Sequence, residues 1–127
     1  MTAGWEKALE RADDDLEAAS QLFRSGHFAQ ACSRAYFAAF TSASGALLRL
    51  GETRSKHAGI LSAFNEFLVK RGDFDPEVAK QLRWLFDLRN RADYQWDPLT
   101  KEEAGEALAG ARRFVGAVRV WMDRGIA

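Results

Sequence analysis

Apolar residues recur at intervals of three and four positions over almost the whole chain, and this spacing is typical of helices. The first 24 residues show it clearly, because apolar side chains share one helical face while charged ones, Asp14 among them, occupy the other. The charged face is expected to lie in solvent. No stretch alternates apolar and polar residues as a strand would. The pattern therefore predicts an all-α protein.

Glycine and capping signals divide this pattern into five helices, expected over about residues 3–24, 28–50, 55–71, 76–92 and 101–124. With 127 residues and short connections, the chain is expected to form a single domain, residues 1–127, folded as an up-and-down bundle of four or five helices. The signals are Gly51 and Gly72 as stops, Asp75 before Pro76 as a start, and Thr100 with Glu103 as a capping box.

The second expected helix is apolar nearly all round. One stripe is rich in alanine, and the opposite side carries Phe37, Phe40 and Leu48. A helix that is apolar on every side is buried on every side. Either its neighbours in the same chain enclose it, or its outer side meets a second molecule. We favour the second interpretation and expect a homodimer whose interface uses the fourth helix and part of the second.

Charge and cysteine content narrow the class of protein. Eighteen basic and eighteen acidic residues cancel, so contact with nucleic acid requires a local patch. No run of about 18 apolar residues exists, so no contact with a membrane is expected. The single cysteine, Cys32, suits a reducing compartment, and the chain is expected to be cytoplasmic. Cys32 and the two histidines lack the spacing of a zinc site, so Cys32 is interpreted as a core thiol and no metal or cofactor is expected.

Common enzyme signatures are absent: there is no glycine-rich phosphate loop, no zinc-protease motif and no nucleophile elbow. His57 begins the third expected helix, and we interpret it as a packed or capping residue rather than a catalytic one.

Arg89 occupies an unusual position on the fourth expected helix, in the middle of an apolar stripe that includes Leu82 and Leu85. An arginine on such a stripe is costly unless it is paired. It can form an internal ion pair or reach water at the end of the helix. Alternatively, its guanidinium is held beside an interface or cleft, where it suits two-point binding of a phosphate.

The neighbours of Arg89 extend this candidate site. Asn90 offers an amide, and Asp93 and Tyr94 follow about one helical turn later. Trp84 and Arg91 share a flank of the helix, and an aromatic ring beside an arginine can stack a nucleobase, although tryptophan packing is commoner. Trp84, Arg91 and Asp93 are therefore candidates for binding a nucleotide or RNA.

Three segments carry a resemblance to a known family: residues 31–40 (ACSRAYFAAF) with 46–48, residues 56–60 ahead of Phe64, and residues 85–94 (LFDLRNRADY) before a helix containing residues 102–104. Their order and spacing, over about residues 5–122, resemble the HEPN domain family, particularly an uncharacterised subfamily with an Arg…Ala-Asp-Tyr signature. The resemblance implies a helical bundle that dimerises.

The resemblance also implies a metal-independent endoribonuclease, because active HEPN ribonucleases carry an Arg-x(4–6)-His motif at the dimer cleft. Arg89 matches the arginine and Asn90 the polar residue after it, but Tyr94 stands at the histidine position. Subfamily members often have a second histidine where this chain has Thr41. The catalytic residues implied are Arg89, Asn90 and Tyr94, in a degenerate motif without its usual acid–base partner.

Many HEPN proteins are encoded beside a minimal nucleotidyltransferase that acts as antitoxin and in some systems adenylylates a tyrosine of its partner. Tyr94 is therefore either a catalyst or an acceptor. The leading hypothesis is a HEPN protein of a toxin–antitoxin-like pair with a nucleotidyltransferase partner and weak ribonuclease activity. The alternatives are a non-catalytic module that binds a nucleotide or a protein, favoured by the missing histidine, and a purely structural helical dimer.

Overall fold

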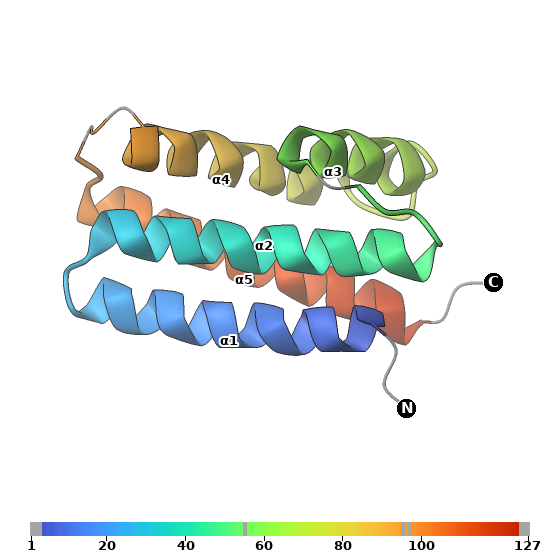
Figure 1. The fold of residues 1–127 in the computed structure, drawn as a ribbon, viewed down its shortest axis with the longest axis horizontal. Coiled ribbons are helices and arrows are strands. Elements are labelled where there is room, and N and C mark those ends of the chain that lie inside the picture. Colours follow the sequence, from blue (N-terminus) through green and yellow to red (C-terminus); the bar gives the residue numbers. More distant parts are fainter. Residues whose placement is uncertain (1–3, 55, 95, 97, 125–127) are drawn as a thin grey trace.

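The computed structural model describes residues 4–54, 56–94, 96 and 98–124, and within these it contains helices and no strand. The predicted all-α fold is confirmed. The chain runs through α1 (Gly4–Arg24), α2 (Phe28–Arg49), α3 (His57–Phe64), the π-helical turn η1 (Asn65–Val69), α4 (Pro76–Tyr94) and α5 (Lys101–Asp123) (Figure 1). None of the helices in these ranges is long and apolar enough to cross a membrane.

The second helix, α2, is the central element. It lies between α1 on one side and α3 and α4 on the other, with α5 behind it in Figure 1, and it contacts all four. Its neighbours in the same chain thus account for most of its apolar surface. Of the outer aromatic and aliphatic residues noted in the sequence, Phe37 and Phe40 are half-buried and Leu48 is 41% exposed.

Small residues let α1 and α2 approach closely. Ala31, Ala35, Ala39, Ala43 and Ala46 of α2 are completely or almost completely buried. At Gly45, a Cβ atom would lie only 2.8 Å from the Cβ of Ala8 on α1. A larger residue there would force the two helices apart.

The capping signals occur where the sequence predicts them. The hydroxyl of Thr100 accepts a hydrogen bond from the backbone N–H of Glu103, whose carboxylate accepts one from the backbone N–H of Thr100, each at 3.0 Å. The carboxylate of Asp75 accepts from the N–H of Glu77 at 2.9 Å. Gly51 adopts a positive φ of 78°, which glycine tolerates without strain.

The third helix differs from the single α-helix predicted over 55–71. Residue 55 lies outside the described residues; α3 ends at Phe64, and a π turn follows, closed by a 2.9 Å hydrogen bond from Lys70 N–H to the carbonyl of Asn65. A π turn winds through fewer degrees per residue than an α turn, so a regular helical wheel fails here. Phe64 and Leu68 are buried, while Phe67 is only half-buried.

The end of α4 also differs slightly, because the helix continues to Tyr94 rather than stopping near residue 92. Asp93 and Tyr94 therefore lie in its last turn. Cys32 is buried, and burial, assisted by the charge of Glu103, raises the pKa of its thiol to about 12. This environment agrees with the interpretation of Cys32 as a core thiol.

Candidate functional site

Arg89 lies on the side of α4 that faces α2, held against aromatic rings. Its guanidinium carbon is 5.3 Å from the ring centroid of Phe37 and 5.8 Å from that of Tyr36. The ring of Tyr94 lies 5.6 Å away on its own helix. The side chain is 16% exposed, so a cation that normally seeks water is largely shielded from it.

Asp93 partly compensates this burial. Its Oδ2 lies 2.8 Å from Nε of Arg89, one helical turn away, which is the ion pair that the sequence left open. The direction of the contact does not meet hydrogen-bond geometry at Nε. No hydrogen bond among the described residues joins Asp93 to the two terminal nitrogens, on which a planar guanidinium carries four of its five N–H donors. Arg89 is thus an ion-paired arginine whose two-point edge is not used by Asp93.

Tyr36 and His57 lie beside Arg89. Tyr36 is completely buried on α2, and its hydroxyl forms a 2.5 Å hydrogen bond with Nδ1 of His57 at the start of α3. The His57 ring stacks on Phe40 with centroids 4.3 Å apart and planes 18° apart. Burial raises the pKa of Tyr36, and the charge of Arg89 opposes that rise. Burial first, then the charge of Arg89, lowers the pKa of His57.

The packed interpretation of His57 agrees with this stacking, but it misses the hydrogen bond to Tyr36. Lys56, not His57, is the residue at the cap position of α3, and no side-chain cap bond forms there. One signal for the pairing was present in the sequence. A tyrosine in a helix that is buried on all sides needs a partner for its hydroxyl, and histidine is a good acceptor.

The six residues singled out from the sequence divide between two sides of α4. Arg89, Asp93 and Tyr94 contact one another on the α2 side, and the Tyr94 side chain is 69% exposed. Asn90 follows Arg89 and is half-buried. Trp84 and Arg91 belong to the side that faces α5, and the structure does not bring them to Arg89.

The α5 side is organised around an ion pair between helices. Nη2 of Arg91 lies 2.6 Å from Oε1 of Glu103, the carboxylate that also completes the capping box. The hydrogen bond from Arg91, followed by that from the backbone of Thr100, lowers the pKa of Glu103 to about 2. Trp84 lines a separate hollow with Glu106 and Arg113 of α5.

A groove of about 580 Å³ borders Asp93 on the α2 side. Arg34 of α2 and Trp96 of the α4–α5 loop take part in its lining, and Trp96 is 87% exposed. The guanidinium of Arg34 lies 5.3 Å from the ring of Phe37 and contacts Asp15 at 3.2 Å. The remaining lining residues are Leu22, Ala29, Gln30, Ser33 and Ala92.

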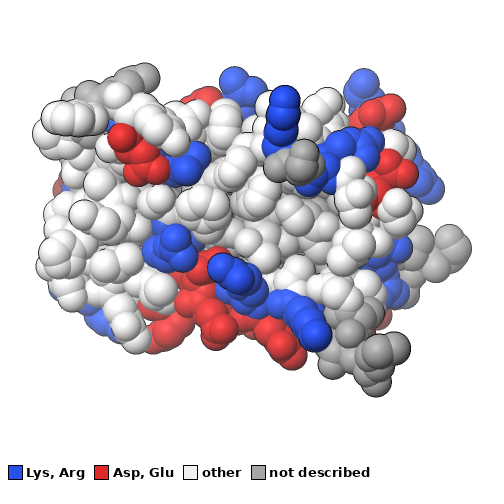
Figure 2. Space-filling model, viewed as in Figure 1, with Lys and Arg blue, Asp and Glu red and all other residues white. Residues whose placement is uncertain are grey.

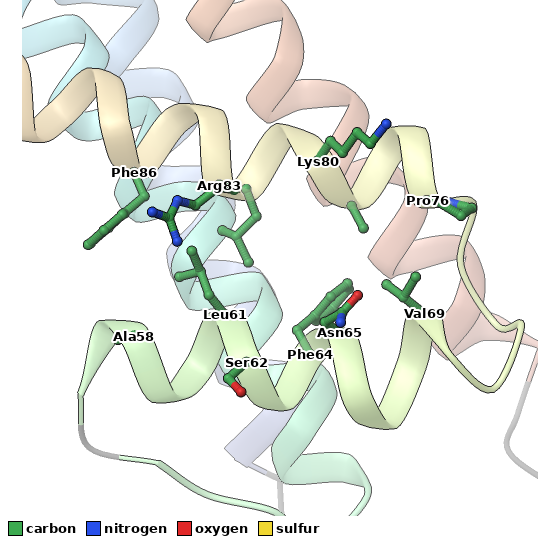
Figure 3. A pocket seen from close by; sticks show the side chains of 12 residues that line it. Ala58, Leu61, Ser62, Phe64, Asn65, Val69, Pro76, Lys80, Arg83 and Phe86 are labelled. Atoms are coloured by element: carbon green, nitrogen blue, oxygen red, sulfur yellow. The ribbon is translucent and has the colours of Figure 1, made fainter.

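A second groove of about 380 Å³ lies between α3 with η1 and α4 (Figure 3). Its described lining is mostly apolar, with Lys80 and Arg83 contributed by α4 and Asn65 by η1. Phe86 borders this groove and also lies 5.8 Å from the ring of Tyr36. Through Phe86 the groove therefore adjoins the rings around Tyr36, but Arg89 is not among its lining residues.

Charge is unevenly distributed over the face that carries α2. Figure 2 shows acidic side chains gathered along the lower edge, over α1, with basic side chains just above them. A broad uncharged area separates these from the charges along the upper edge. The zero net charge therefore does not mean that acidic and basic side chains are evenly mixed on this face.

Known proteins resemble this chain both in fold and in sequence. The crystal structure of TT1696 from Thermus thermophilus is similar with a TM-score of 0.79 and 25% identity, covering 92% of this chain and 97% of that one. A Methanocaldococcus jannaschii protein named "Putative toxin MJ0605" is 33% identical over 111 residues, 87% of this chain and 83% of the relative. A Thermotoga maritima "UPF0332 protein" is 37% identical over 109 residues, 85% and 83% of the two chains. The HEPN domain family matches residues 5–121, and the chain therefore belongs to the HEPN domain family.

Proposed function

We propose that this chain is the toxin-like member of a toxin–antitoxin-like pair and that Arg89 binds a backbone phosphate of RNA. The toxin names of relatives support the first part. The observation that carries the second is the placement of Arg89, which is held against the rings of α2 with 16% exposure and whose nearest atom to Asp93 is Nε. A cation that is already oriented and shielded from water stabilises developing phosphate charge more than a solvated one.

The reaction that fits this site is metal-independent cleavage of RNA. The 2′-hydroxyl attacks the adjacent phosphorus, a 2′-O–P bond forms and the P–O5′ bond breaks. The 2′-hydroxyl loses its proton, and the leaving 5′ oxygen gains one. Arg89 neutralises the phosphate oxygens, Asn90 orients the phosphate, and the exposed phenol of Tyr94, beside Arg89, donates or relays a proton.

The groove beside Asp93 offers space for the rest of the nucleotide. Its volume of about 580 Å³ lies within the range of ligand sites. The exposed indole of Trp96 can stack a base, and Arg34 can contact a second phosphate. Nucleic-acid binding then comes from a local patch, as the zero net charge requires.

A homodimer would complete this site. The half-buried rings of Phe37, Phe40 and Phe86 surround His57 on the face formed by α2 and α4. Pairing two such faces would shield these rings and bring two copies of Arg89 toward one cleft. Sedimentation at micromolar concentration tests this part of the proposal, and a monomer would contradict it.

Expression of the chain in a bacterial host, alone and with the neighbouring gene, tests the toxin function. Arg89→Ala should abolish growth inhibition and slow RNA cleavage about 100-fold or more. Arg89→Lys should rescue poorly, because an ammonium cannot copy the two-point fork. Arg83→Ala is the matched control, since it removes the same charge from an exposed position of the same helix. Full toxicity of Arg89→Ala, or no cleavage by the wild-type protein, would overturn the proposal.

A second candidate function follows from the exposure of Tyr94. Of the two tyrosines, Tyr36 is buried and Tyr94 is 69% exposed, which makes Tyr94 the accessible phenol. A nucleotidyltransferase partner would transfer AMP from ATP: the phenol oxygen bonds to the α-phosphorus, pyrophosphate leaves, and a base of the partner takes the phenol proton.

Tyr94→Phe separates the two candidates, because it removes only the hydroxyl. If Tyr94 is catalytic, the variant loses cleavage. If Tyr94 is the acceptor, the variant cleaves RNA normally, but its toxicity is no longer relieved and its mass no longer rises by one AMP when the partner is co-expressed. Unchanged behaviour in both assays would contradict both roles.

A further inference from the structure

We propose that His57 and Arg89 form a single phosphate-binding site, in which His57 contributes an Nε2–H donor oriented by Tyr36. The inference rests on the proposed binding of phosphate by Arg89 and adds a residue from another helix. Arg89 and His57 contact the same two rings: the His57 ring lies 5.6 Å from Tyr36 and 6.0 Å from Phe37, between centroids. The guanidinium of Arg89 lies 5.8 and 5.3 Å from those rings.

The hydrogen bond with Tyr36 determines which nitrogen of His57 carries the proton. Tyr36 is completely buried, and its one hydrogen-bond partner among the described residues is Nδ1 of His57. A buried hydroxyl that could not donate would leave its hydrogen unsatisfied, which is costly. Because burial raises the pKa of Tyr36, the phenol keeps its proton and donates it in the hydrogen bond to Nδ1. A neutral imidazole has one N–H, so the proton of His57 resides on Nε2.

The electrostatic environment links His57 to whatever binds Arg89. The charge of Arg89 contributes to the lowered pKa of His57, after burial. A phosphate on Arg89 would offset that charge and so ease protonation of His57, a change that reverses the hydrogen bond with Tyr36 because both ring nitrogens of His57⁺ donate. Among the described residues, the charged and titratable groups at the rings around His57 are Arg89 with its partner Asp93, Arg83 over Phe86, Arg34 over Phe37, and Tyr36 itself.

Proton and nitrogen NMR of the two histidines tests the proposal directly. In the wild-type protein, His57 should appear as the Nε2–H tautomer. Inorganic phosphate, added at constant ionic strength against chloride, should raise the pH at which His57 titrates and leave the exposed His27 unchanged. Arg89→Gln should raise the pH at which His57 titrates in the absence of phosphate. It should also abolish the shift that phosphate causes in the wild-type protein. Arg83→Gln, which removes a cation that lies over Phe86 instead, should shift the His57 titration less than Arg89→Gln does and leave its response to phosphate intact.

Binding measurements separate a donor from a packing residue. His57→Gln should weaken phosphate binding about tenfold, as expected for loss of one hydrogen bond to a charged group. Tyr36→Phe keeps the ring but removes the hydroxyl, so His57 should populate both tautomers and bind phosphate more weakly. Circular dichroism verifies that each variant is folded; for a variant that is not, the wild-type tautomer and phosphate titration decide the proposal.

An Nδ1–H tautomer, or a His57 titration that ignores both phosphate and Arg89→Gln, would overturn the proposal. If either of these results occurs and Arg89→Ala still loses toxicity, His57 is not part of the site, but the proposed function stands. Full toxicity of Arg89→Ala would overturn the proposed function, whereas a response of His57 to phosphate would still support the anion site.

Discussion

The two sides of α4 use arginine in different ways. Arg91, on the α5 side, contacts the carboxylate of Glu103 at 2.6 Å and so joins α4 to the start of α5. Arg89, two residues earlier, faces α2 and contacts aromatic rings, and its ion-pair partner among the described residues is Asp93 of its own helix. Yet Arg89 is the more buried of the two, at 16% against 30% exposure. The exposed fraction alone therefore does not explain how the two arginines differ; the difference lies in the partner of each and in the geometry of the contact.

Substitutions in the buried core, between the α2 and α5 sides of α4, should change the stability of the protein most. Leu85 is 1% exposed, and Leu85→Ala should lower the free energy of unfolding by about 2–4 kcal/mol, through lost burial and a cavity. Asp14→Ala, on the solvated face of α1, should change it by less than about 0.5 kcal/mol. Urea denaturation measures both. Equal effects at the two positions would mean that the assigned faces of the helices are wrong.

Substituting the two arginines by methionine, which keeps much of the side-chain volume, tests the contrast itself. Arg91→Met should cost about 1 kcal/mol of stability, because it breaks a charged hydrogen bond between two helices at a partly exposed site. Arg89→Met should cost less, about 0.5 kcal/mol or under, because its ion pair lies within one helix. The effect on toxicity should be the reverse: Arg89→Met should lose more toxicity than Arg91→Met. Thermal unfolding measures the stability of the two variants and growth assays measure their toxicity. A larger loss of stability in Arg89→Met, or a larger loss of toxicity in Arg91→Met, would contradict the prediction.

The smallest expected effect is a pH dependence on the α5 side. The pKa of Glu103 is about 2 in the folded chain against an ordinary value of 4.5, so its charged form is favoured by folding. Its contribution is therefore complete above about pH 4.5 and disappears as the pH falls toward 2. Glu103→Gln should flatten the loss of stability over that interval, as measured by denaturation at several pH values.

Local chemistry made much of the fold predictable. The capping box at Thr100 and the proline start of α4 depend on residues that are neighbours in sequence, so their patterns could be read directly. The π turn could not, because its wider hydrogen-bonded turn follows from packing and residues 65–69 carry no signal for it. The helical wheel placed Arg89 correctly on the inner side of α4. Arg91 lies on a different face, the flank that it shares with Trp84, and a helical wheel could not show that Glu103 of α5 would be its partner there.

The partnership of Tyr36 with His57 was out of reach for a different reason. The two residues are 21 positions apart and meet only because α3 packs on α2. Periodicity indicates which face of a helix is buried, but it does not indicate which residue of another helix lies opposite. The family motif places a histidine after Arg89; under the proposal made above, His57, which precedes Arg89 in the chain, takes a place beside that arginine instead.

The close approach at Gly45 has a consequence for motion. A Cβ at this position would meet Ala8 at 2.8 Å and the backbone carbonyl of Trp5 at 3.4 Å, so α1 and α2 have no space in which to slide against each other. Interfaces packed so tightly move as rigid bodies. Any adjustment to an incoming RNA or protein is therefore expected to displace α4 relative to the α1–α2 pair. Arg89 would travel with α4 while Tyr36 stays behind, which makes the separation of these two residues a natural coordinate of opening and closing.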